Sequence, residues 1–207
     1  MAESAVGDDR KTERLTALSD GIFAIAMTLL VLDVHIPPGL TDKGFRDAVG
    51  DVVPDLGAYA LSFMILSAFW HDNRRIVALV PRFDGPALQL ALIWLGAIAL
   101  IPFPTSLLSE YAYEPLAVAV YAGAVSLTNL LELAVLKTGL RVARPDGPAA
   151  RATARAVATD LCGTACVFGA TVPLAFLLSP TAAMWSWLAL VPVKVVLGRR
   201  SRRQESR

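Results

Sequence analysis

Residues 14–36, RLTALSDGIFAIAMTLLVLDVHI, decide the fold of this chain. The segment is mostly apolar, and an α-helix needs about 20 such residues to cross the hydrocarbon core of a bilayer. It nevertheless carries Ser19 and Asp20 near one end and Thr28 near its middle. An ionisable group within a membrane span is costly, so Asp20 is a candidate functional residue by default. The segment therefore predicts a membrane helix with a specific role.

The rest of the chain has the same apolar character. Of its 207 residues, 55% are hydrophobic, and the mean hydropathy is +0.55, which is more than a soluble domain of this length has. We predict an all-α integral membrane protein with six transmembrane helices. A membrane domain over residues 14–198 lies between an N-terminal segment, 1–13, and a basic tail, 199–207. The predicted spans are residues 15–36, 52–71, 86–108, 115–137, 156–178 and 181–197.

Basic residues predict how the chain crosses the membrane. With six spans, both termini and the loops after spans two and four share one side. That side holds all the Lys and Arg residues except Lys43 and Arg46, which is 19 − 2 = 17 of 19. Such loops are cytoplasmic by the positive-inside rule. We therefore expect both termini in the cytoplasm, and the polar first thirteen residues do not predict a cleaved signal peptide.

Connections between the spans are predicted to be short. The outer loop over residues 37–51 is turn-rich, and we expect at most one helical turn in it. Pro145, Gly147 and Pro148 are expected to break any helix in the inner loop before span five.

Cys162 and Cys166 lie one helical turn apart in span five. Two cysteines alone do not make a disulfide framework or a zinc site, so we expect no metal centre.

The first span carries a narrow stripe of branched aliphatic side chains. Successive helical residues turn by about 100°, which places Leu29 at about +40° and Leu32 at about −20° from Ile25. Leu18 and Ile36 fall on the same stripe, and Thr28 flanks it. Asp20 falls on the opposite face, at about −140°, where we expect it to be buried and paired with other helices.

Two interpretations of this stripe are open. It can face lipid or pack against a neighbouring helix, as aliphatic stripes of membrane helices commonly do. Alternatively, copies of the helix surround an axis, and rings formed by Ile25, Leu29 and Leu32 make constrictions that gate by dewetting. The position of Asp20 away from the stripe leaves the aliphatic residues on the free face in either case.

Polar residues near the inner end of the spans form a second candidate group. Asp20, Glu132 and Asp160 are predicted to lie at similar depth, with cationic partners nearby. This group can be a structural ionic layer or a gating and proton-sensing network, since histidine titrates near physiological pH. The predicted members of the network around the first span are Arg14, Ser19, Asp20, His71 and Arg74.

Several segments resemble the endosomal and lysosomal potassium channel family and its bacterial relatives. RLTALSDGIFAIAMTLLVLDV resembles the family signature, which has Arg, then Phe-Ser-Asp, then an aliphatic helix. PDLGAYALSFMILSAFW and FWHDNRR resemble the second span and its end, and IALIPFPTSLLSEY resembles the third. Leu18 replaces the usual Phe of the signature, and His71 stands where the family usually has a His before its Arg. The resemblance covers residues 14–111.

This resemblance implies a potassium-selective cation channel of the leak type, without a TVGYG filter and without classical voltage gating. Bacterial members have one six-span unit per chain and form homotetramers whose pore is lined by the first helix. Carried over by position, Ile25, Leu29 and Leu32 form the constriction that serves as gate and filter, and Thr28 is a candidate for selectivity. The expected location is the plasma membrane of a bacterium, with K⁺ as the permeant ion and the bilayer as the surroundings.

Other functions are less consistent with the sequence. A proton-coupled secondary transporter that uses the inner carboxylates is the main alternative. Transporters usually bind substrate near the midplane on broken helices, whereas the first span has no such break. A membrane scaffold without transport is a third hypothesis. No nucleophile–base pair indicates an enzyme, and we expect no cofactor, no metal and no nucleic-acid partner.

Overall fold

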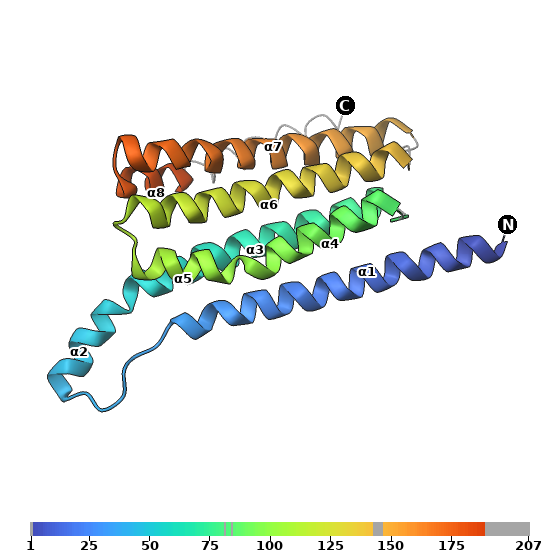
Figure 1. The fold of residues 1–207 in the computed structure, drawn as a ribbon. Coiled ribbons are helices and arrows are strands. Elements are labelled where there is room, and N and C mark those ends of the chain that lie inside the picture. The colour runs from blue at the N-terminus through green and yellow to red at the C-terminus, as the bar shows by residue number, and fades with distance from the viewer. Residues whose placement is uncertain (1, 81, 84, 143–146, 189–207) are drawn as a thin grey trace.

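The chain is a bundle of long helices joined by short connections (Figure 1). The computed structural model describes residues 2–80, 82–83, 85–142 and 147–188. In chain order its elements are α1 (Ala2–Leu29), the 3₁₀ helix η1 (Leu30–Asp33), α2 (Asp42–Asp51), α3 (Val53–Leu79), α4 (Gly85–Leu100), α5 (Pro102–Glu110), α6 (Pro115–Val142), α7 (Gly147–Leu177) and α8 (Pro180–Leu188).

The all-α membrane architecture predicted from the sequence is confirmed, and the described residues contain no strand. Within the same residues, five helical segments are long and apolar enough to cross a bilayer. Of the predicted sixth span, α8 supplies the beginning, and residues 189–197 lie outside the described residues, as does the tail 199–207. The qualifying segments are Lys11–Leu32, Asp42–Leu79, Gly85–Glu110, Pro115–Arg141 and Gly147–Leu177.

Two connections differ from the prediction. The loop over residues 37–51 contains α2, a helix of ten residues rather than a single turn. The Thr41 side chain accepts a hydrogen bond from the Gly44 amide at 3.3 Å and caps this helix. Helix α7 begins at Gly147 and not near residue 156. Pro148 lies in its first turn, where a missing N–H costs no hydrogen bond. It therefore starts the helix that it was expected to break.

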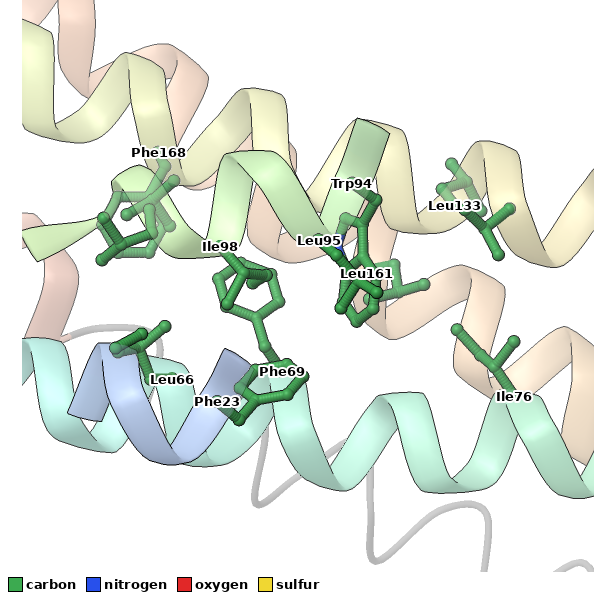
Figure 2. Packing of buried hydrophobic residues seen from close by; sticks show 14 of the residues in the cluster. Phe23, Leu66, Phe69, Ile76, Trp94, Leu95, Ile98, Leu133, Leu161 and Phe168 are labelled. Atoms are coloured by element: carbon green, nitrogen blue, oxygen red, sulfur yellow. The ribbon is translucent and has the colours of Figure 1, made fainter. Parts of the chain in front are cut away.

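The three-dimensional arrangement puts α1 at the edge of the bundle. In Figure 1, α1 lies alongside α3 and α4, whereas α6, α7 and α8 lie on the far side of those two helices. Side chains from five of the helices fill the interior between them, as Figure 2 shows for Phe23, Leu66, Trp94, Leu133 and Phe168, all of which are buried. One flank of α1 is therefore built into the core, and the other has no neighbour among the helices that the structure describes.

The end of α3 and helix α6 approach closely at Gly139. A Cβ atom at this position would lie 2.7 Å from both Cγ atoms of Val80, which is fully buried. We expect Gly139→Ala to lower the free energy of unfolding by about 1–3 kcal/mol, because Val80 has no room to move. Thermal unfolding in detergent measures this effect.

The same helix supplies the control for this prediction. A methyl group added at Gly123 would have no atom of a neighbouring residue within 4 Å, so Gly123→Ala should leave stability unchanged or raise it through helix propensity. Adding Val80→Ala to the Gly139→Ala variant should restore part of the stability that Gly139→Ala loses. Equal melting of the two glycine variants would contradict the close approach of α3 and α6.

Candidate functional site

The two faces of α1 have opposite environments. Its buried residues repeat every three or four positions, so they form one face of the helix. These residues are Leu15, Ser19, Phe23, Ala26 and, where η1 continues the helix, Leu30. The face packs against α3, α4 and α5, and the Phe23 ring meets the Trp94 ring of α4 edge-on, with centroids 5.8 Å apart. This packing fixes the orientation of the helix about its own axis.

The aliphatic stripe lies on the free face. Ile25 is 60% exposed, Leu29 is 41% exposed and Leu32 is 68% exposed. Leu18 and Ile36, at the two ends of the stripe, are exposed as well. Because a single chain leaves all five side chains uncovered, the stripe is available to lipid or to another copy of the chain.

Thr28 lies beside this stripe and is exposed. Its hydroxyl donates a hydrogen bond to the backbone carbonyl of Ile25 at 2.9 Å. The hydrogen of the hydroxyl is therefore used within the helix, and the oxygen keeps lone pairs that can accept from water or contact a cation. Thr28 thus adds an oxygen at the level of the aliphatic residues.

Asp20 joins α1 to the C-terminal half of α3. One carboxylate oxygen accepts a hydrogen bond from the Trp70 indole N–H at 2.9 Å, and the other lies 3.5 Å from an Arg74 guanidinium nitrogen. The Arg74 guanidinium also lies over the Trp70 ring, 5.7 Å from its centroid, in a cation–π arrangement. The carboxylate is paired, as expected, but it is half-exposed in the single chain rather than buried.

Ser19 makes a separate contact with α3. Its hydroxyl accepts a hydrogen bond of 2.6 Å from the Asn73 side-chain amide, and both residues are buried. The adjacent residues Ser19 and Asp20 therefore attach α1 to α3 through one buried hydrogen bond and two partly exposed contacts. Together these contacts set the depth of α1 relative to α3.

The structure does not bring every predicted residue into this network. Arg14 and His71 are exposed, and within the described residues no hydrogen bond or ion pair connects either of them to Asp20. Trp70 and Asn73 take part although the sequence did not point to them. Glu132, which is buried, lies on α6, and Asp160 lies on α7. Each of the two residues makes an interaction elsewhere in the chain.

The described part of the chain contains no group of three or more His, Cys, Asp or Glu side chains that could hold a metal ion. Cys162 and Cys166 are free thiols, exposed on α7.

The comparison with known proteins identifies the family. Residues 14–102 match the family described as endosomal/lysosomal potassium channel TMEM175. A relative from Streptomyces collinus, which is named a potassium channel, is 37% identical over 187 residues, covering 86% of this chain and 89% of the relative. The chain belongs to the TMEM175 family. A second bacterial relative, a potassium channel of Chamaesiphon minutus, is 36% identical over 56% of this chain and 60% of its own length.

The TMEM175 fold extends over nearly the whole chain. The crystal structure of a lysosomal potassium-selective TMEM175 homologue from Chamaesiphon minutus matches with a TM-score of 0.75 at 26% identity. The match covers 93% of this chain and 98% of that one. The helices beyond residue 111, which the sequence resemblance did not reach, therefore share the TMEM175 fold too. The family description names potassium channels, as the names of the bacterial relatives do.

Proposed function

We propose that this chain is one subunit of a homotetrameric, potassium-selective leak channel in a bacterial plasma membrane. Membership of the TMEM175 family supports potassium conduction, since its bacterial relatives are named potassium channels. The observation that carries the proposal is the position of α1, which lies at the edge of the bundle with Ile25, Leu29 and Leu32 uncovered. Four copies of this edge, facing one axis, make a pore that one chain cannot make alone.

The stripe then acts as both gate and filter. Four Ile25 side chains at one level, with Leu29 and Leu32 at others, form aliphatic rings that block ions when they are too narrow to stay wet. Aliphatic rings offer no oxygen to replace a hydration shell, so an ion passes with much of its water. K⁺ is less strongly hydrated than Na⁺, so a tight wetted ring penalises it less. The Thr28 oxygen supplies a polar contact beside the rings.

The ends of the bundle differ in charge, which supports a cytoplasmic location for the N-terminus. The start of α1 lies at the same end of the bundle as the end of α3, the end of α6 and the start of α7 (Figure 1), and most basic residues of the described chain are on these segments. Lys43 and Arg46 lie on α2 at the opposite end. By the positive-inside rule the basic end is cytoplasmic. The acidic residues around α2 would concentrate cations at the outer pore mouth.

Flux from vesicles tests the proposed function. Purified protein in liposomes should pass K⁺ in preference to Na⁺, with unitary currents in a planar bilayer. A proton-coupled transporter would instead give saturable flux that stops when the proton gradient is removed. Flux indistinguishable from empty liposomes would leave only a scaffold role and contradict the proposal.

The contacts of Asp20 are expected to govern assembly rather than ion discrimination. Asp20→Ala removes both the Trp70 hydrogen bond and the Arg74 ion pair. We expect the assembled protein to lose about 1–2 kcal/mol of stability, a modest amount because both contacts are partly exposed. Asp20→Asn keeps an oxygen for Trp70 and should lose less. Tetramer survival on heating, measured by size-exclusion chromatography, reports the loss. A changed K⁺/Na⁺ permeability ratio with normal assembly would contradict the off-axis position of Asp20.

A further inference from the structure

A small cavity lined by α1, α3, α4 and α6 includes both partners of the Ser19–Asn73 hydrogen bond in its wall. Its volume is about 10 Å³, and its walls include Thr16, Ser19, Asn73, Ala91 and Trp94. One water molecule needs a space of about 10–15 Å³ and two to four polar partners. The cavity therefore has room for one water molecule and for no larger ligand.

Trp94 gives a separate reason to expect an occupant. The residue is 2% exposed, and its indole N–H has no hydrogen-bond partner among the residues that the structure describes. Figure 2 shows the ring within the cluster of buried hydrophobic side chains. A buried donor without an acceptor has lost its hydrogen bonds to water without replacement, so native proteins rarely leave one unsatisfied. Because Trp94 lines the cavity, a water molecule there can accept its hydrogen bond.

Two other lining residues, Ser19 and Asn73, supply acceptors that such a water molecule needs. Ser19 Oγ accepts from Asn73 at 2.6 Å, and a hydroxyl oxygen has a second lone pair. The Asn73 side chain also has a carbonyl oxygen, and no hydrogen bond of the described residues uses it. A water molecule can therefore accept from Trp94 and donate to Ser19 or Asn73.

We propose that a single buried water molecule occupies this cavity and connects Trp94 of α4 with Ser19 of α1 and Asn73 of α3. It completes the hydrogen bonding of Trp94 and ties the inner half of α1 to both of its neighbours. The proposal rests on the cavity and on the buried donor, and it holds whether or not the protein conducts ions.

A high-resolution density map of the purified protein is the direct test. We expect one water peak within about 2.7–3.2 Å of Trp94 Nε1 and of an oxygen of Ser19 or Asn73. Trp187 is the internal control, because its buried indole N–H already donates to Thr171 at 3.1 Å and needs no water. An empty cavity in a map that resolves other buried waters would overturn the proposal.

Filling the cavity gives an independent test through the sign of a stability change. Ala91→Val adds two methyl groups at the cavity wall. If the cavity holds a bonded water molecule, the variant displaces it and leaves Trp94 unsatisfied, so the unfolding midpoint should fall by about 2–4 °C or more. If the cavity is dry, the added methyl groups fill a void and the midpoint should rise. A rise would contradict the proposal.

Trp94→Phe is the companion variant, because Ala91→Val can also overpack the site. It removes the N–H donor and keeps an aromatic ring against Phe23. In its density map the water peak should weaken or disappear, since one of its few partners is gone. A peak of undiminished strength would show that the water does not depend on Trp94 and would overturn the assigned hydrogen bonding.

Discussion

Ile25→Asn is expected to raise the resting cation flux of the channel by roughly tenfold or more and to reduce its preference for K⁺ over Na⁺. In a tetramer the substitution places four amide groups at one level of the pore, where they hold water that an aliphatic ring excludes. Lowering the barrier to permeation by about 1.4 kcal/mol is enough for a tenfold increase in rate. Flux of K⁺ and Na⁺ from liposomes, at matched protein density, measures both effects.

Ile93→Asn is the matched control for this prediction. Ile93 is the same residue type with the same 60% exposure as Ile25, but it lies on α4 instead of the stripe. The control should insert a polar group into an exposed membrane face without changing the resting flux. If Ile25→Asn leaves the flux and the ion preference unchanged, or if Ile93→Asn changes them equally, Ile25 does not form the constriction.

The faces of the first helix could be predicted because they depend on local geometry alone. A turn of about 100° per residue puts Ile25, Leu29 and Leu32 together in any α-helix, and the structure leaves all three exposed. The same rule separates Asp20 from the stripe. The length and number of the apolar segments likewise predict an all-α membrane protein before any packing is considered.

Contacts between distant parts of the sequence could not be predicted in this way. Trp70 and Asn73 lie 50 and 54 residues from their partners Asp20 and Ser19, and only the packing of α3 against α1 brings them together. Arg14 and His71 were equally reasonable candidates by charge, yet both are exposed and lie outside the network. The helix around the predicted span 156–178 begins earlier, at Gly147, for a different reason. Hydropathy locates the part of a helix that lies in the bilayer and does not locate the ends of a helix that continues into water.

Leu29→Cys is expected to make the channel sensitive to Cd²⁺, which tests directly whether the stripes of four subunits converge. Thiolates prefer soft metal ions, and a four-cysteine site binds such an ion with an apparent free energy on the order of 10 kcal/mol. Micromolar Cd²⁺ should therefore occupy the ring of four thiolates that the substitution introduces and reduce K⁺ flux by roughly tenfold or more. A chelator should restore the flux.

This experiment needs a background without native thiols, because Cys162 and Cys166 are exposed one helical turn apart on α7. Both are replaced by alanine first. Leu92→Cys on α4 is the control, since Leu92 is 46% exposed and Leu29 is 41% exposed. Thiols that face lipid from separate subunits are too far apart to share one ion. Block of the Leu92→Cys variant alone, or of neither variant, would therefore mean that the stripe of α1 faces the acyl chains and that the pore lies elsewhere.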